Sequence, residues 1–322
     1  MQAFGASSVS PRAGNDSLPL LDGFTAGVLS CPSRAPRACA WYAGRMASHD
    51  DELPAPLLDW LHELGWPRRT RRALTPDGYP VIPWLVSAMC SGTGDDVAGY
   101  DDTDPRVNEH DALPLLEELL AHLDDPCRVA PDGTGALHHA SRSPRTTERL
   151  LAAGFPVNAS DVSGITPLHK AVAVGNTEVV GLLLAAGADP HSPAKRFDAL
   201  TLAVQGQHAE LVDRFLDLGL TPNRRLGENA HTALMSLSYR DNDALLSRLL
   251  AAGADASLVG ADGYTALIQA LRTGASPDAV RRLLDAGACV HPAPGSCWTP
   301  LLVAASANPL LIPLLLDAGA LA

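Results

Sequence analysis

Lysine and aromatic residues are scarce in this chain. Of its 24 basic residues only Lys170 and Lys195 are lysine, aromatic residues make up 5% of the sequence, and the formal net charge is -12. A general binder of nucleic-acid backbones needs a basic face, so this acidic balance argues against nucleic acid as a partner. Arginine and alanine in place of lysine are typical of a GC-rich genome, which indicates a bacterial origin.

Long apolar runs are also missing. No stretch approaches the roughly 18 consecutive apolar residues of a transmembrane helix, so we expect no membrane span. The cysteines lack any Cys-x-x-Cys spacing, and we expect them to be small buried hydrophobic residues rather than disulfide partners or zinc ligands. They are Cys31, Cys39, Cys90, Cys127, Cys289 and Cys297.

Recognisable catalytic motifs are absent from the sequence. It contains no Gly-x-Ser-x-Gly, Walker A, His-Glu-x-x-His or dinucleotide-binding glycine pattern. We therefore expect no enzymatic activity, no cofactor and no metal. The alternative is an enzyme confined to the N-terminal region, whose candidates Cys90, His110 and Cys127 have no recognisable spacing.

A motif recurs along the second half of the chain with steps of 31, 32, 34, 33 and 34 residues. The best-preserved copy reads Thr166-Pro167-Leu168-His169 and closes at a glycine. Equivalent positions begin the copies at Gly135, Thr166, Asp198, Thr232, Thr265 and Thr299, and the closing glycines are Gly154, Gly187, Gly219, Gly253, Gly287 and Gly319. This pattern resembles the ankyrin repeat, with about six repeats over residues 130–322.

Each recurring position of this motif has a physical role. The Thr166 hydroxyl can cap a helix, and Pro167 suits the first helical position, where no amide hydrogen is needed. Gly175 permits a tight turn into a second helix, and Gly187 suits a left-handed residue after that helix. The resemblance implies an all-α solenoid of stacked helix-turn-helix units with projecting β-turn fingers, stabilised by contacts between neighbours. We expect the motif histidines, His138 and His169, to form structural hydrogen bonds.

The chain divides into three parts. Residues 1–45 are a leader rich in Ser, Ala, Gly and Pro, which we expect to be disordered. Residues 46–129 resemble a diverged helical capping region with an acidic loop at 91–110, a small separate helical domain being the alternative. Residues 130–322 form the ankyrin-repeat domain.

The leader leaves two interpretations open. It resembles the secretion signals of bacterial proteins that are injected into host cells, or the natural start is Met46. The first implies secretion into a host cell, and the second a cytoplasmic protein.

The resemblance implies a protein-binding scaffold that uses the concave groove and fingers of the array. The alternative within that class is an injected effector that engages a host protein. Residues before each motif and before each inter-helix turn should face the groove, and Tyr and Arg are enriched in interface hot spots. The candidate partner-binding residues are Phe197, His231, Tyr239, Arg240, Tyr264, Arg272 and Trp298.

The C-terminal repeat should present an apolar outer face. Its second helix, residues 308–317, is almost free of charge and contains Pro313 at about the fifth helical position, where proline removes a backbone hydrogen bond. Such a face favours self-association or docking on a partner. The alternative is that Leu321 and its neighbours fold back over it.

Overall fold

The computed structural model describes residues 53, 55–63, 80–90, 109–122, 127, 129–291 and 299–320. Within these ranges the regular structure is helical, and β-structure is limited to isolated bridges, Leu226 with His231 and Val259 with Thr265. Every helix in this part of the chain is too short or too polar to cross a bilayer. The leader of residues 1–45 and almost all of the acidic loop lie outside the described residues.

The helices follow one another as pairs, each made of a first helix, a turn and a second helix. Helix α2 (Ala55–Glu63) precedes the pairs. The first pairs in chain order are α3 (Val81–Cys90) with α4 (Glu109–His122), α5 (Ala136–His139) and its 3-10 extension η3 (Ala140–Arg142) with α6 (Pro144–Ala152), α7 (Pro167–Val174) with α8 (Thr177–Ala185), and α9 (Ala199–Gln205) with α10 (Ala209–Asp217). The remaining pairs are α11 (Ala233–Ser236) with α12 (Asp243–Ala251), α13 (Ala266–Thr273) with α14 (Pro277–Asp285), and α15 (Pro300–Ala307) with η4 (Pro309–Leu311) and α16 (Ile312–Asp317). The all-helical repeat architecture predicted from the period is confirmed.

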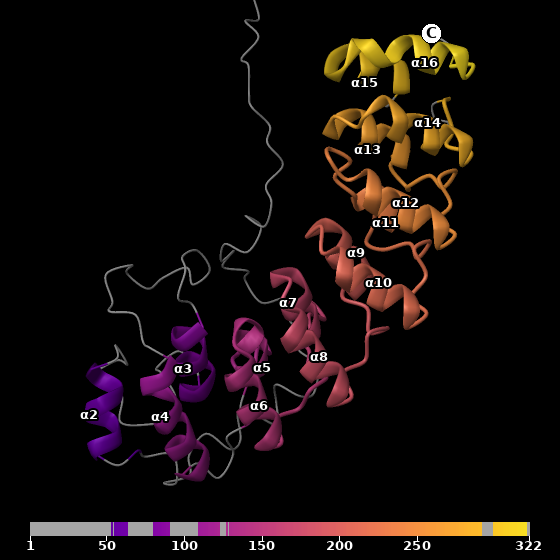
Figure 1. The fold of residues 1–322 in the computed structure, drawn as a ribbon. Coiled ribbons are helices and arrows are strands. Elements are labelled where there is room, and N and C mark those ends of the chain that lie inside the picture. The colour runs from indigo at the N-terminus through magenta and orange to yellow at the C-terminus, as the bar shows by residue number, and fades with distance from the viewer. Residues whose placement is uncertain are drawn as a thin grey trace, which may run out of the picture. The chain divides into compact units, whose positions relative to one another are not determined.

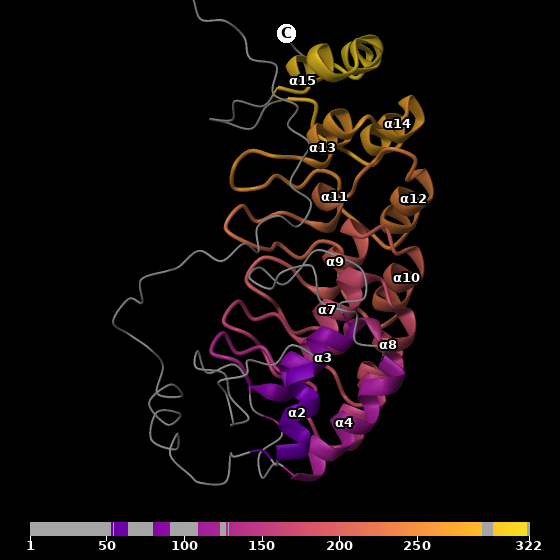
Figure 2. The ribbon, with the colours of Figure 1, turned by 90° about the vertical axis from the view of Figure 1, so that its left-hand side faces the viewer.

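First and second helices form two rows (Figure 1). Each first helix contacts the first helix of the next pair from α5 through α15, and α6 contacts α8 in the second row. The loops between repeats extend on the side of the first helices, as Figure 2 shows. One continuous hydrophobic core runs through all pairs, because each helix pair buries its apolar side against its neighbours.

Helices α3 and α4 form a helix pair of their own before the first motif. Helix α3 packs against both α4 and α5. Leu85 of α3 and Leu115, Leu116 and Leu119 of α4 are fully buried. The described residues of 49–92 and 105–322 belong to one compact unit.

The motif residues play the roles expected from their chemistry. The Thr166 hydroxyl accepts a hydrogen bond from the His169 amide at 3.4 Å, and His169 Nδ1 accepts one from the Thr166 amide at 3.2 Å, which closes a capping box. Gly175 ends α7 in the left-handed region at φ 78°, and Gly187 follows α8 at φ 89°. A residue with a side chain would be strained at either glycine.

The motif histidine of the first repeat has the structural role predicted for it. His138 Nδ1 accepts a hydrogen bond from the Gly135 amide at 3.0 Å, and its Nε2 lies 3.0 Å from the carbonyl oxygen of Ile165 in the next finger. Burial lowers the pKa of His138 and of His169, so both rings are neutral at pH 7. The neutral ring can accept at one nitrogen and donate at the other, as this bridge requires.

The fourth repeat departs from the expected helix. Helix α11 ends at Ser236, and Leu237 is extended with φ -71° and ψ 135°. The chain therefore leaves helical geometry before Tyr239, whose side chain is 1% exposed and donates a hydrogen bond to the Leu234 carbonyl oxygen at 2.9 Å. This corrects the expected position of Tyr239, because its ring lies in the core and does not face a groove.

The sixth repeat also departs from expectation. A single second helix was expected there, but Pro309–Leu311 form a 3-10 turn and α16 begins at Ile312. Pro313 thus occupies the first turn of a new helix, where no hydrogen bond is lost, and not the fifth position of a longer one. The apolar outer face is present, since Leu310 is 86% exposed. Leu321 lies outside the described residues.

Candidate functional site

The predicted partner-binding residues are not equally accessible. Arg240 and Arg272 are exposed, Phe197 and His231 are half-buried, and Tyr264 is 6% exposed. Trp298 lies outside the described residues, and Tyr239 is in the core. The finger bases and the ends of the first helices form a surface that we call the first-helix face. Its residues are the accessible Phe197, His231, Arg240, Asp262 and Arg272, together with the largely buried Tyr264.

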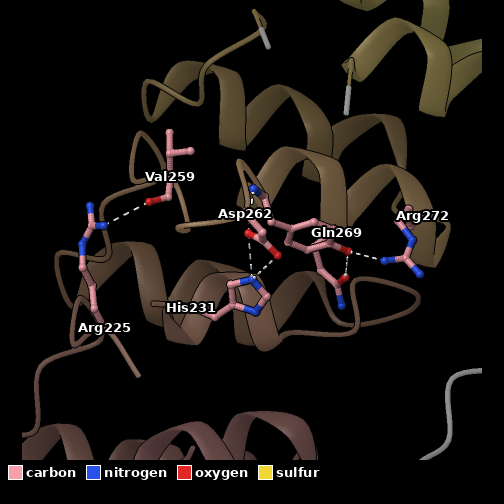
Figure 3. A network of polar contacts seen from close by, with 7 residues as sticks. Arg225, His231, Val259, Asp262, Gln269 and Arg272 are labelled. Carbon is pink, nitrogen blue, oxygen red and sulfur yellow. Dashed lines mark hydrogen bonds and ion pairs between the residues drawn. The ribbon is translucent and has the colours of Figure 1, made fainter. Parts of the chain in front are cut away.

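His231 and Asp262 join the fourth and fifth fingers (Figure 3). His231 Nε2 lies 3.1 Å from Asp262 Oδ2 and 3.3 Å from Oδ1, and each side chain is about one-third exposed. The Asp262 carboxylate also accepts a hydrogen bond from the Tyr264 amide at 3.0 Å. The His231 and Tyr264 rings stack with centroids 5.3 Å apart and an interplanar angle of 29°. These contacts hold two adjacent fingers in register.

A second chain of polar contacts runs from this stack to the end of α13. Arg272 Nη1 donates to the Tyr264 hydroxyl at 2.8 Å, which donates to Gln269 Oε1 at 2.6 Å. Gln269 Nε2 donates in turn to the Leu237 carbonyl oxygen at 3.0 Å, in the preceding repeat. The Arg272 guanidinium also lies 5.7 Å from the centroid of the Tyr264 ring. Arg272 is therefore both exposed and held in place (Figure 3).

The protonation state of Tyr264 suits this chain of contacts. Burial raises the pKa of its hydroxyl, an effect that the nearby Arg272 charge partly opposes. The hydroxyl therefore keeps its proton at neutral pH. It can donate to Gln269 while it accepts from Arg272.

Arg240 lies against the turn that follows Arg272. A Cβ atom built on Gly274 would lie 3.2 Å from Arg240 Nη2, so the guanidinium occupies the space beside this left-handed glycine. Tyr239 links the same two turns, because its amide donates to Thr273 Oγ1 at 3.1 Å. The two arginines thus come from consecutive repeats and flank one turn.

Phe197 stands apart from the stacked pair. Its ring lies 5.8 Å from the Cζ atom of Arg196, the residue before it in the same finger. Among the described residues, the ring stack of His231 and Tyr264 includes no Phe197 contact. Of the described ring-bearing candidates Phe197, His231 and Tyr264, only His231 and Tyr264 therefore form a stacked pair.

Two residues of the network were missed in the sequence. Asp262 lies three residues before its motif, as Asp132 does, and each accepts a hydrogen bond from the amide two residues further on, so this shared spacing could have identified it. Gln269 is a polar residue on a buried helix face, where its need for partners was the available signal.

The first-helix face offers hydrogen-bond donors and charged side chains for chemistry. Across the described ranges no group of His, Cys, Asp and Glu has the geometry of a metal site. Cys127 and Cys289, the cysteines whose side chains the structure describes, are half-buried. Their partial exposure differs from the full burial expected for the cysteines.

Comparison with known proteins identifies the repeats. The chain matches the family described as ankyrin repeats, in three copies, over residues 107–194 and 234–321. The human ASB11 ankyrin repeat domain has a similar structure, with a TM-score of 0.55 and 24% sequence identity; the match covers 65% of this chain and 94% of that domain. This likeness supports the fold.

Curated relatives share the repeat region. The chain is 34% identical over 193 residues to glycerophosphocholine phosphodiesterase gde1 of Schizosaccharomyces pombe. This match covers 58% of this chain and 16% of that protein. It is 31% identical over 150 residues to the neurogenic locus Notch protein of Drosophila melanogaster, covering 43% of this chain and 5% of that protein. The chain therefore spans a small fraction of the length of these relatives. Because the family match covers more than half of the chain, the protein belongs to the ankyrin-repeat family.

Proposed function

We propose that this protein is a protein–protein interaction scaffold that binds a partner protein through the first-helix face of its third to fifth repeats. Ankyrin repeats generally mediate protein–protein interaction, and function in such arrays resides in exposed side chains that the repeat itself does not require. The observation that carries the proposal is the exposed arginine pair, Arg240 and Arg272, beside the His231–Tyr264 stack, with Arg272 held by the Tyr264 hydroxyl.

This surface has the features of an interaction site. Aromatic residues and arginine are enriched at the centre of protein interfaces. The contacts that fix Arg272 on Tyr264 lower the conformational entropy that this side chain loses on binding. A partner would therefore meet a partly preorganised surface.

Comparative capture from a lysate tests the proposal. The wild-type chain, an Arg240→Ala/Arg272→Ala variant and an Arg145→Ala/Arg214→Ala variant are used as baits, and retained proteins are identified by mass spectrometry. Arg145 and Arg214 are exposed on second helices, so the control removes the same charge from the other row. A protein retained by wild type and control and lost from the first variant supports the proposal. Identical retention by all three baits contradicts it.

A second candidate function is self-association through the open side of the last repeat. The fourth motif position is buried in each earlier repeat, where the next repeat covers it: His138, His169, Thr201, Met235 and Ile268. Its equivalent in the last repeat, Leu302, is 63% exposed, and Leu316 of α16 is 50% exposed. The same kind of surface that joins repeats within the chain is therefore available to a second copy.

Residues 46–129 serve as the N-terminal capping region, consistent with the packing of α3 on α5. A cytoplasmic scaffold of bacterial origin is the preferred setting, and an injected effector that engages a host protein is the alternative. Fusion of residues 1–60 to a reporter separates the two, since transfer of the reporter into host cells requires a secretion signal.

A further inference from the structure

Main-chain hydrogen bonds join most neighbouring fingers. We number each finger by the repeat that it precedes, so that fingers 1 to 5 are residues 130–134, 155–165, 188–197, 220–231 and 254–264. One amide donates to a carbonyl oxygen of the preceding finger in three neighbouring pairs: Val162 to Asp132 at 2.9 Å, Lys195 to Ser163 at 3.1 Å, and Ala261 to Asn229 at 2.7 Å. Fingers 3 and 4, whose residues are all described, share no main-chain hydrogen bond.

An asparagine near the start of a finger makes a second kind of link. In finger 2, Asn158 Nδ2 donates to the Gly187 carbonyl oxygen at 3.0 Å, and its Oδ1 accepts from the Asp189 amide at 2.9 Å, where the chain leads into finger 3. Asn223 of finger 4 makes the same two bonds to the main chain that leads into finger 5, at 2.8 and 2.7 Å. His191 occupies this position in finger 3, and its exposed side chain makes no hydrogen bond to the described residues of finger 4.

The fourth motif position makes a third link, which repeat 3 also lacks. His138 of repeat 1 reaches the carbonyl oxygen of Ile165 in finger 2, at 3.0 Å from Nε2. Repeat 3 has the shorter Thr201 at this position. Its hydroxyl lies 2.9 Å from Asp198 Oδ1 and accepts a hydrogen bond from the Asp198 amide at 3.0 Å. Both contacts stay within repeat 3, so they do not connect it to finger 4.

The contacts that remain between repeats 3 and 4 are mainly between helices. Helix α9 contacts α11 in the first row. In the second row Arg248 of α12 pairs with Asp213 of α10, and such exposed ion pairs contribute little to stability. Between the fingers, Arg224 Nη1 donates to the His191 carbonyl oxygen at 3.1 Å. The fingers are therefore held together more weakly here than at the neighbouring junctions.

The backbone on both sides of this junction is strained. Among the described residues other than glycine, those with positive φ are Gln207 at 59°, Ala230 at 53° and Asp241 at 59°. Gln207 and Asp241 lie in the inter-helix turns of repeats 3 and 4, where repeats 2 and 5 have Gly175 and Gly274. Helix α11 is also reduced to four residues. The two repeats that meet at the junction are thus locally less stable than their neighbours.

We propose that the array has a hinge between repeats 3 and 4, at which fingers 3 and 4 spread apart while α9 and α11 stay in contact. Bending concentrates where the fewest hydrogen bonds must break, and the missing links all lie in the fingers. Phe197 lies on finger 3 and His231 on finger 4, so the hinge sets the distance between two parts of the first-helix face. The hinge itself does not depend on partner binding.

Distances between pairs of spin labels test the hinge on the full chain. The labels are carried by a genetically encoded non-natural amino acid, which leaves the cysteines unmodified, at the exposed finger positions Pro131, Lys195 and Ala261. The Pro131/Lys195 pair spans fingers 1 to 3 and the Lys195/Ala261 pair spans fingers 3 to 5, so each pair crosses two finger junctions. Double electron–electron resonance measures the distribution of distances for each pair. The label at Lys195 is common to both pairs, so its own mobility affects them equally.

The distance distribution of Lys195/Ala261 should be about twofold or more wider than that of Pro131/Lys195, because only the first pair spans the hinge. His191→Asn supplies a donor and an acceptor where Asn158 and Asn223 have them, so it should narrow the Lys195/Ala261 distribution. Asn158→His is the reverse change at the junction of fingers 2 and 3 and should widen the Pro131/Lys195 distribution. Both substitutions are at exposed positions, and circular dichroism checks that the helix content is unchanged.

Three outcomes would overturn the hinge. Equally narrow distributions for the two pairs in the wild type would show that the junction of repeats 3 and 4 is as rigid as the others. Equally wide distributions would show that bending is spread along the array. A wider Lys195/Ala261 distribution, with neither His191→Asn nor Asn158→His changing the width of its pair, would contradict the finger links as the cause.

Discussion

The Arg272 guanidinium donates a hydrogen bond to the Tyr264 hydroxyl over 2.8 Å, and the same hydroxyl donates to Gln269. Tyr264 therefore connects the core of the fifth repeat to an exposed charge. Changes at Tyr264 should affect stability and binding together, whereas changes at Arg272 should affect mainly binding.

Tyr264→Phe removes the hydroxyl and keeps the ring that stacks on His231. Gln269 Oε1 then loses its buried donor, which should lower the free energy of unfolding by about 1–3 kcal/mol. Urea denaturation followed by circular dichroism measures the change. Arg272→Gln, which leaves the Tyr264–Gln269 bond in place, should cost less; a larger loss for Arg272→Gln would contradict this assignment.

Tyr239 should behave as a core residue. Tyr239→Ala should lower the free energy of unfolding by about 3–5 kcal/mol, because a fully buried ring leaves a cavity. Tyr239→Phe loses only the hydrogen bond to Leu234 and should cost about 1 kcal/mol. Chemical denaturation measures both variants. An alanine variant with wild-type stability and weakened partner binding would return Tyr239 to the binding surface.

Gly253→Val should destabilise the fourth repeat through its backbone alone. Gly253 has φ 81°, a conformation that a β-branched residue adopts only with strain, and no atom lies within 4 Å of the position a Cβ would take. We expect a loss of about 1–3 kcal/mol in the free energy of unfolding. Ala252→Val, at an exposed neighbour with φ -79°, is the matched control and should lose clearly less. Equal losses of unfolding free energy in the two variants would indicate that the valine side chain, and not the backbone conformation at Gly253, is the cause.

Stability should fall in mild acid because the motif histidines are buried. Burial lowers the pKa of His138 and His169, and burial with the His138 and Lys170 charges lowers that of His139 to about 4. Well above pH 6.5, the ordinary pKa of histidine, these rings are unprotonated in both the folded and the unfolded state, and the fold keeps its full stability. Between pH 6.5 and about 4 the unfolded chain takes up protons that the folded chain excludes, so the free energy of unfolding decreases.

Denaturation at several pH values measures this decrease. His169→Gln removes one of the titrating rings, so its free energy of unfolding should fall less between neutral pH and pH 5 than that of wild type. His191→Gln, at an exposed finger residue, is the control and should follow the wild-type slope. A wild-type slope in His169→Gln would show that this ring does not contribute.

Self-association should depend on the open side of the last repeat. Static light scattering at tens of micromolar should show dimers of the wild type that Leu302→Lys/Leu316→Lys converts to monomers, because the substitutions place charge on the apolar contact. Leu218→Lys changes an equally apolar exposed residue at the end of α10 and should leave the dimer intact. A wild type that is strictly monomeric would contradict the proposal.

Much of the repeat could be predicted from single residues. Thr166 and Asp198 begin their helices because their side-chain oxygens accept amide hydrogen bonds, a property that acts within four residues. Gly175 and Gly187 end helices because glycine adopts positive φ without strain. These preferences are local, so the period and the boundaries of these helices could be predicted before any contact between repeats was known.

The accessibility of the binding surface could not be predicted from the repeat period, because it depends on packing contacts that the period does not specify. The period alone placed Tyr239 beside Arg240 on the same face, but α11 stops at Ser236 and turns the ring inward. Ser236 and Ser238 weaken the helix, yet the direction of Tyr239 depends on the space beside Leu234, which only packing defines.

The sequence by itself determined the ankyrin-repeat family, the all-helical fold and the structural role of the motif histidine His138, because short-range capping, turn and periodic patterns encode them. The tertiary structure alone decided which side chains remain accessible and which are held. Arg272 became a positioned charge through Tyr264, and Leu302 became exposed while its equivalent Ile268 is covered by the next repeat. Exposure and orientation depend on neighbours one repeat away, a separation at which residue preferences carry no information.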